Sequence, residues 1–410
     1  MTVRRIAAIA FALSGLVGDV QAEGEFSAVL RAIPETHELR SASPFALAAP
    51  LTDFGRDRAR FDLEARARWK ALAFVGTARS TLLEGREPRH EGFVNELYAD
   101  TTIGGQSFSL GKKIAGWGVG FGFRPLDVVQ QQDRRVLNLF TPEGIPAVAW
   151  ERFTDTAAWT VLYANPTQGR AGESRDDESL ALRAFRQAGP TDWHGVARWS
   201  TRHRVQVGAG ANHVVSDSTQ VYGSLLFMRR HDRGSNALAA TGGTLSASDP
   251  MIFGVAGPAW QFAAGGSWTG ESGIGVLVEA WYDGTAWRRD EWTALHALAL
   301  RQAALLGAPG VPESAVRGNL AYGLSAFERP NLARENLLGR ISYDGEFWDA
   351  ALDVLLTPRD RGAVLTASVS RQYDKLRWEL GLRRYAGPPG SAYGMLPERH
   401  VGYLATQLYF

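Results

Sequence analysis

The 410-residue chain contains no cysteine, which excludes disulfide bonds and thiol chemistry. Only four of its 44 basic residues are lysine, namely Lys70, Lys112, Lys113 and Lys375. After residue 22 no apolar run approaches the roughly 20 residues that a membrane-spanning helix needs. The chain also lacks an H-E-x-x-H, a G-x-S-x-G and a P-loop sequence. We therefore predict that it is not an enzyme and that it binds no cofactor.

The first 22 residues have the pattern of a secretory signal. Arg4 and Arg5 form a basic start, Ile6–Val17 is a short apolar run, and Val20-Gln-Ala22 is a small-residue cleavage pattern. We predict a signal peptide over residues 1–22 and one domain over 23–410. The formal net charge is +1 and falls to about zero without the leader, which argues against a nucleic-acid partner.

Glycine and aromatic residues are abundant, with 45 glycines and 13 tryptophans. The clearest strand pattern lies at residues 61–70, where Phe61, Leu63, Ala65, Ala67 and Trp69 alternate with Asp62, Glu64, Arg66, Arg68 and Lys70. Because successive side chains of a strand point to opposite faces, one face is apolar and the other is charged. A soluble sandwich shows this with its apolar face in the core, and a membrane barrel shows it with that face toward lipid.

The same reasoning predicts about 18 strands, with 16 or 20 as alternatives, in an all-β, transmembrane antiparallel barrel. The expected strands are 25–33, 61–70, 73–83, 93–103, 107–117, 145–153, 157–164, 179–187, 194–200, 205–215, 219–230, 260–269, 273–283, 334–343, 347–356, 363–372, 376–385 and 400–410. Residues 291–306 have helical spacing and predict one helix inside a long loop, before Pro309 and Pro312. Residues 230–250 are rich in Gly, Ser and Ala and are expected to be a mobile loop.

The chain ends on an alternating strand, Val401–Phe410, with an aromatic as its last residue. An exposed strand edge is an aggregation hazard, so we expect the last strand to pair with the first and close a barrel. This ending resembles the closing strand of Gram-negative outer-membrane β-barrels. The resemblance implies a place in the bacterial outer membrane, contact with lipid and lipopolysaccharide, and recognition of the strand ending at Phe410 by the barrel assembly machinery.

The strand order also predicts two different rims. Short connections such as Gly104-Gly105, Ala188–Thr191, Ser216–Ser218 and Asp344-Gly345 fall on one side. Long connections, at 34–57, 119–144, 166–177, 231–256, 284–332 and 386–399, fall on the other. This asymmetry is typical of outer-membrane barrels and predicts short periplasmic turns and long extracellular loops.

One segment, Gly111-Lys-Lys-Ile-Ala-Gly-Trp-Gly118, resembles the glycine–basic…Trp-Gly strand end of porin-like families, including alginate-export and substrate-specific porins. The loop after it is polar and is too long for a simple connection. In such barrels a loop of this kind can fold into the lumen, and an exposed surface loop is the equal alternative. We expect constriction residues at Arg124, Asp127, Gln131, Asp133, Arg134 and Arg135, with Arg66, Arg68, Arg377 and Arg383 on the facing wall.

The charged strand faces have two interpretations, an ion-pair lattice that fills the barrel and a water-filled pore lined by charge. The excess of arginine favours an anionic solute, since its planar fork pairs with carboxylate and phosphate. A GC-rich codon bias explains it equally well.

The predicted function is a porin-like channel for small polar or anionic solutes or saccharides. The alternative is a structural or export-conduit component of an envelope secretion system. Asn212 and His213, beside Ser216, resemble the polar triplets of outer-membrane phospholipases, but adjacent strand positions point apart. The sequence leaves the oligomeric state open.

Overall fold

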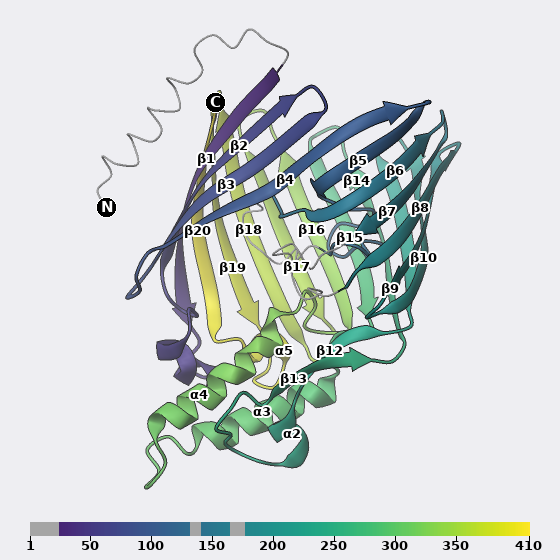
Figure 1. Cartoon of the computed structure of the whole chain (residues 1–410). Coiled ribbons are helices and arrows are strands. Elements are labelled where there is room, and N and C mark those ends of the chain that lie inside the picture. The colour runs from purple at the N-terminus through teal and green to yellow at the C-terminus, as the bar shows by residue number, and fades with distance from the viewer. Residues whose placement is uncertain (1–23, 132–140, 165–176) are drawn as a thin grey trace.

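The computed structural model describes residues 24–131, 141–164 and 177–410. The expected signal peptide, residues 1–22, lies outside these ranges and stays a prediction. The chain folds into one closed barrel of 18 antiparallel strands, with short helices gathered at one end (Figure 1). The predicted fold class and strand number are confirmed.

The barrel strands follow one another around the barrel in chain order. Their bounds are β1 (Gly24–Leu39), β2 (Arg58–Trp69), β3 (Leu72–Leu83), β4 (Arg89–Ile103), β5 (Gln106–Lys113), β6 (Ile145–Phe153), β7 (Ala157–Ala164), β8 (Ser179–Ala188), β9 (Thr191–Ser200), β10 (Arg204–Ser216), β11 (Thr219–Met228), β14 (Ala259–Thr269), β15 (Ile274–Asp283), β16 (Glu335–Asp344), β17 (Asp349–Thr357), β18 (Gly362–Tyr373), β19 (Leu376–Ala386) and β20 (Glu398–Tyr409). Two further strands, β12 (His231–Asn236) and β13 (Met251–Ala256), form a separate hairpin.

The barrel closes between its first and last strands, as the sequence predicts. Val29 of β1 stands opposite Tyr409 of β20, and the Phe410 amide donates to the Ala28 carbonyl at 2.9 Å. The sequence placed the end of the first strand at Ile33, because Pro34 follows, whereas β1 continues to Leu39. The β1–β20 register runs from Ala32 to Glu35 with no pair at Pro34, so the strand passes the proline at the loss of local pairing.

The two rims differ as expected. Gly104 and Gly105 join β4 to β5 with φ values of 58° and 75°, the left-handed conformation that a two-residue hairpin turn requires. β1 begins and β20 ends at this short-turn rim, at the top of Figure 1. In the part of the chain that the structure describes, the helices and the connections 40–57, 229–258, 284–334 and 387–397 lie at the opposite rim, which we call the loop rim.

The helices at the loop rim pack into a cap with its own apolar core. They are η2 (Pro44–Leu51), α2 (Ala237–Thr241), α3 (Arg289–Ala303), α4 (Glu313–Gly323), η4 (Leu324–Glu328) and α5 (Ala392–Met395). Phe45, Trp292, Leu320 and Tyr393 are almost fully buried in this core. Among the described residues, no helix is long and apolar enough to cross a membrane.

Two expectations at this rim need correction. The single helix predicted at 291–306 corresponds to α3, but a second helix, α4, follows directly after Pro312. Pro312 is the N-cap residue of α4, so it marks a helix start as well as a boundary. The segment 230–250, expected to be a mobile loop, contains β12 and α2, and the Trp287 indole donates to the Gly234 carbonyl at 2.8 Å.

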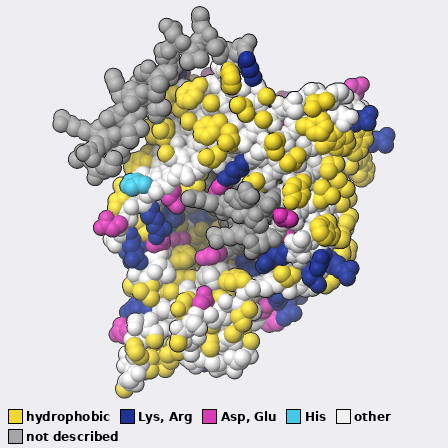
Figure 2. Space-filling model, in the orientation of Figure 1, with side chains coloured by type: hydrophobic (Ala, Val, Ile, Leu, Met, Phe, Trp, Pro, Cys, Tyr) yellow, Lys and Arg dark blue, Asp and Glu magenta, His cyan; other side chains and the backbone are white. Residues whose placement is uncertain are grey.

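The barrel surface is apolar outside and charged inside. Trp69 is 54% exposed on the outer face of β2, while Asp62 and Glu64 on its inner face are fully buried. Figure 2 shows apolar side chains spread over the barrel wall. A soluble protein rarely exposes so much apolar surface, and an outward apolar band is the surface of a membrane-embedded barrel. This arrangement confirms the outward assignment of the apolar face at residues 61–70.

Candidate functional site

The inner wall formed by β1, β2 and β3 carries a lattice of ion pairs. The Glu64 carboxylate forms ion pairs with Arg31 at 2.9 Å and with Arg66 at 2.7 Å. The Asp62 carboxylate accepts hydrogen bonds from Nε and Nη2 of Arg79, at 2.8 and 2.9 Å. Two buried carboxylates are thereby neutralised by neighbouring guanidinium groups, which buried charge requires. On this wall the charged strand face therefore forms an ion-pair lattice, the first of the two interpretations that the sequence left open.

The segment after β5, residues 114–131, runs into the barrel and is fixed there by its own side chains. The Asp127 carboxylate accepts hydrogen bonds from the backbone amides of Trp117 and Gly118, both at 2.5 Å. Gln130 accepts from the Ala115 amide at 3.0 Å and donates to the Glu143 carbonyl at 2.7 Å. We call residues 114–131 the inner loop.

A single carboxylate on the barrel wall anchors this inner loop. Glu279 of β15 is fully buried and accepts from three consecutive backbone amides, those of Phe121 at 2.6 Å and of Gly122 and Phe123 at 2.9 Å. The Tyr222 hydroxyl of β11 donates to the same carboxylate at 2.5 Å. A carboxylate with four donors is a strong and directional acceptor, so Glu279 sets the position of the loop.

Apolar contacts support the same docking. Leu126 is completely buried in a cluster that contains Leu162, Val196 and Leu226 of the facing strands. A Cβ built at Gly208 would lie 2.7 Å from Leu126, so the glycine makes room for the leucine. The inner loop therefore lies against the β7–β11 side of the barrel.

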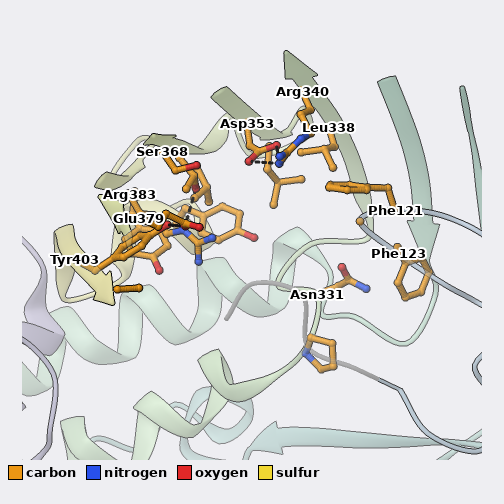
Figure 3. A pocket seen from close by; sticks show the side chains of 18 of the residues that line it. Phe121, Phe123, Asn331, Leu338, Arg340, Asp353, Ser368, Glu379, Arg383 and Tyr403 are labelled. Carbon is orange, nitrogen blue, oxygen red and sulfur yellow. Dashed lines mark hydrogen bonds and ion pairs between the residues drawn. The ribbon is translucent and has the colours of Figure 1, made fainter. Parts of the chain in front are cut away.

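A cavity of about 720 Å³ remains between the inner loop and the opposite wall. Phe54 and Tyr393 line it near the loop rim, and Arg377 and Tyr409 line it near the short-turn rim, so it extends along the lumen. Figure 3 shows Phe121 and Phe123 of the inner loop on one side and the side chains of β16–β20 on the other.

The wall opposite Phe121 alternates basic and acidic groups. Arg340 of β16 binds both oxygens of Asp353, at 3.0 and 2.9 Å, and lies over the Phe121 ring at 5.3 Å (Figure 3). Arg383 of β19 donates to the Thr366 hydroxyl at 3.0 Å. The Tyr403 hydroxyl donates to Glu379 at 2.5 Å. Among the described lining residues, five arginines stand against four carboxylates, which leaves a small positive excess.

The structure brings together half of the residues expected at a constriction. Arg124, Asp127, Gln131, Arg377 and Arg383 line this one cavity. Arg66 and Arg68 are not among its lining residues, because Arg66 bonds Glu64 and the Thr141 hydroxyl, and Arg68 lies 3.9 Å from Asp100. Asp133, Arg134 and Arg135 lie outside the described residues. Lining a cavity does not establish a role, so a function in permeation stays a prediction for all ten.

Sequence reasoning missed Glu279 and Arg340, whereas the alternation of the strand at 347–356 places Asp353 on the inward face. The sequence feature that could have identified Glu279 is its position between two apolar residues of β15, Val278 and Ala280, whose side chains point to the opposite face. It could indicate an inward carboxylate, but the sequence gives no sign that its partners are the amides of residues 121–123. The pairing depends on how the inner loop folds.

A second polar cluster ties connections together at the loop rim. His203, in the turn after β9, bonds Asp177 at 2.7 Å and Asp232 of β12 at 3.0 Å. Burial opposes the charged ring, but hydrogen bonds to these two carboxylates raise the pKa of His203 above its usual value. The His203 bond and the Arg198 charge outweigh burial and lower the pKa of Asp177. Near neutral pH His203 is therefore charged and paired with both carboxylates, and we call His203, Asp177 and Asp232 the charged clamp.

No family model matches the chain, and no curated protein matches it in sequence. Three solved structures of Pseudomonas aeruginosa proteins are similar in fold. They are OccK1 (OpdK), with TM-score 0.53 and 10% identity, OccK8 (OprE), with 0.51 and 11%, and OccK5 (OpdH), with 0.50 and 11%; in each case 95% of this chain and 98% of the other are covered. OpdK with vanillate also matches, at TM-score 0.53 and 10% identity. At these identities the likeness shows the barrel fold.

Proposed function

We propose that this chain is a channel of the bacterial outer membrane that admits small polar solutes and weakly favours anions. The observation that carries the proposal is the cavity along the lumen, bounded by an anchored inner loop on one side and a charged wall on the other. A barrel wall packed with side chains would need no anchored loop within it. The fold shared with P. aeruginosa outer-membrane channels supports the same function.

The weak anion preference follows from the lining charges. Arg340 is matched by Asp353, so this pair adds little net field. Arg383 donates to the neutral Thr366 hydroxyl, and Arg124 donates to the neutral Gly120 carbonyl through its Nε. Neither of these two hydrogen bonds cancels the charge of the guanidinium group. Guanidinium groups beside walls of low dielectric raise the local concentration of anions. Carboxylates and phosphates fit the arginine fork, so carboxylated solutes are the first ones to test.

The test is conductance of the purified chain in a planar bilayer. We expect discrete channels whose reversal potential in a KCl gradient shows a small preference for chloride. Arg383→Ala should move the reversal potential toward the cation side, more at 0.1 M salt, where the Debye length is about 10 Å, than at 1 M, where it is about 3 Å. Arg301→Ala, which removes an exposed arginine of α3 outside the lumen, is the matched control.

A barrel that inserts but does not conduct would overturn the channel proposal. Vanillate, with which OpdK was solved, is a suitable test anion because it carries one carboxylate on an aromatic ring, and Phe121 offers an aromatic face beside Arg340. If vanillate blocks chloride current in the wild type and in Arg301→Ala but less in Arg383→Ala, Arg383 contacts permeating anions. Equal block in all three would remove it from the pathway.

The orientation is part of the proposal. The short-turn rim faces the periplasm and the loop rim, with its helical cap, faces the outside of the cell, as the resemblance of the C-terminal strand implies. The C-terminal strand ending at Phe410 is the expected recognition element for the assembly machinery, and its pairing with β1 supports a role in closure.

A further inference from the structure

The wall of the lumen cavity presents hydrogen-bond donors and acceptors side by side in one row. The strand register places four cavity-lining residues at successive inward positions, namely Arg340 of β16, Asp353 of β17, Thr366 of β18 and Arg383 of β19. Neighbouring strands lie about 4.8 Å apart, so the row is a continuous polar strip. Arginine offers only donors, ionised aspartate only acceptors, and threonine both. We call these four residues the polar strip.

The next inward row, toward the short-turn rim, forms a hollow beside the polar strip. Its members on β17, β18 and β19 are small, namely Ala351, Ser368 and Gly381. A Cβ built at Gly381 would lie 2.3 Å from the Tyr403 ring, so the glycine lets this ring lie against the wall, with its hydroxyl donating to Glu379. Figure 3 shows Ser368, Glu379 and Tyr403 together on this wall. The hollow gives a solute room to reach the strip.

The charges of the polar strip are matched locally. Asp353 accepts from Arg340 through both of its oxygens, and Arg383 donates to the Thr366 hydroxyl. An anion that approaches Arg340 has to compete with Asp353, and taking one partner from a partly buried charge pair is costly. A hydroxyl group, by contrast, can donate to the carboxylate and accept from the guanidinium while the pair stays intact. The strip therefore suits a solute that carries many hydroxyl groups.

An aromatic face lies across the cavity from the strip. The Phe121 ring is 38% exposed and lines the cavity, and Arg340 lies over it at 5.3 Å. The Phe121 amide donates to Glu279 at 2.6 Å, so the barrel wall itself holds the backbone that carries this ring. The negative face of an aromatic ring attracts weakly positive C–H groups. A sugar ring has such C–H faces and a rim of hydroxyls, which match the ring and the strip respectively.

We propose that the cavity binds a short neutral saccharide between Phe121 and the polar strip. This inference rests on the proposed function, because the site lies in the lumen of the channel, and it deepens that function by naming a class of solute. The weak preference for anions concerns mobile ions, whereas the saccharide is held by groups whose charges are already paired. The cavity, of about 720 Å³, falls in the range of roughly 300–1,000 Å³ that is usual for small-molecule sites.

The experiment is block of the single-channel chloride current by maltotriose, compared with block by a polyethylene glycol of equal hydrodynamic radius. The glycol has many ether acceptors and almost no donors, so it measures block by size alone. We expect maltotriose to block at the lower concentration. Thr366→Val, which removes the hydroxyl and keeps the shape, should raise the half-blocking concentration of maltotriose about fivefold, equivalent to one hydrogen bond of ~1 kcal/mol.

Two further variants sharpen the test. Phe121→Leu keeps an apolar side chain but removes the aromatic face, and it should also raise the half-blocking concentration of maltotriose. Thr160→Val is the matched control for Thr366→Val, since Thr160 is an inward threonine of β7 that is absent from the described lining of the cavity. It should leave the block unchanged. All three substitutions are neutral, so the reversal potential in a KCl gradient should stay that of the wild type.

Three results would overturn the site: equal block by the glycol and maltotriose, wild-type block in both Thr366→Val and Phe121→Leu, or equal weakening in Thr160→Val. Stronger block by the zwitterion glycylglycine would overturn the choice of a saccharide. Isothermal titration calorimetry of the chain in detergent measures maltotriose binding without conduction. A chain that conducts but neither binds nor is blocked would remove the site and leave the channel, and one that binds but does not conduct would remove the proposed function and leave the site.

Discussion

Replacing Glu279 tests whether one carboxylate holds the inner loop in the lumen. Glu279→Ala removes the acceptor of three backbone amides and of the Tyr222 hydroxyl. Hydrogen bonds to a charged group contribute about 1.5–3 kcal/mol each, but water in the lumen can replace part of them. A net loss of ~3 kcal/mol is therefore a conservative value. It corresponds to about a hundredfold change in the ratio of docked to undocked loop.

The expected result is a noisy channel with a higher open level. Leu126 and the Asp127 hydrogen bonds remain, so the loop should leave its site intermittently and stay otherwise folded. Glu279→Gln should have a smaller effect, because one side-chain oxygen still accepts from the Gly122 and Phe123 amides. Tyr222→Phe, which removes one of four donors, should be milder than Glu279→Ala.

Single-channel recording in a planar bilayer measures these changes directly. Glu151→Ala is the matched control, since Glu151 is an inward carboxylate on β6 that accepts from the Thr160 hydroxyl and from none of the amides of residues 121–123. The reasoning is refuted if Glu279→Ala conducts as quietly as the wild type and at the same level. It is also refuted if Glu151→Ala produces the same noise, because loss of lumen charge alone would then explain the effect.

Three further predictions concern assembly, pH and orientation. Deleting Phe410 removes the residue whose amide bonds Ala28, and we expect poor insertion, seen as loss of heat-modifiable mobility; insertion at the wild-type level would contradict this. His203→Gln should increase protease sensitivity at the loop rim near neutral pH. Because the pKa of His203 is raised, its contribution is complete below about 6.5 and declines as pH rises through the folded pKa, so wild type and variant should converge in alkali; a gap that is constant with pH would argue against the clamp. A protease-sensitive tag at Pro309, between α3 and α4, should be cleaved on intact cells and one at Gly345 should be protected; the opposite pattern would reverse the proposed orientation.

The barrel could be predicted from the sequence because its strands repeat a simple physical rule. Alternation at 61–70 indicated the faces of β2, and the order of short and long connections indicated the rims. Turn chemistry at Gly104-Gly105 placed one hairpin. These signals are local, since a side chain in a strand points one way or the other whatever the rest of the chain does.

The lumen could be predicted only in part. The polar residues of the segment after Trp117 suggested an inward loop, and Arg124 and Asp127 do line the cavity. Asp127 is nevertheless occupied by two backbone amides, so its first role is to shape the loop. Contacts such as Glu279 with residues 121–123 join positions about 157 apart in the chain, and no local pattern encodes them. Apart from α3, the cap helices were missed for a similar reason, because their apolar faces meet only after the barrel brings its connections together.

The helical cap has a consequence for the seam between β1 and β20. The connection that follows β1 and the connection that precedes β20 meet in it: the Ser43 hydroxyl donates to the Met395 carbonyl at 2.5 Å, and Arg40 donates to the carbonyl of Pro397 at 2.7 Å through its amide. The arm from Phe45 to Ala48 packs with Tyr393 in one apolar core. The cap thus adds contacts between the two connections that flank the seam of β1 and β20. These contacts can form only after β20 is in position, and once formed they resist separation of β20 from β1.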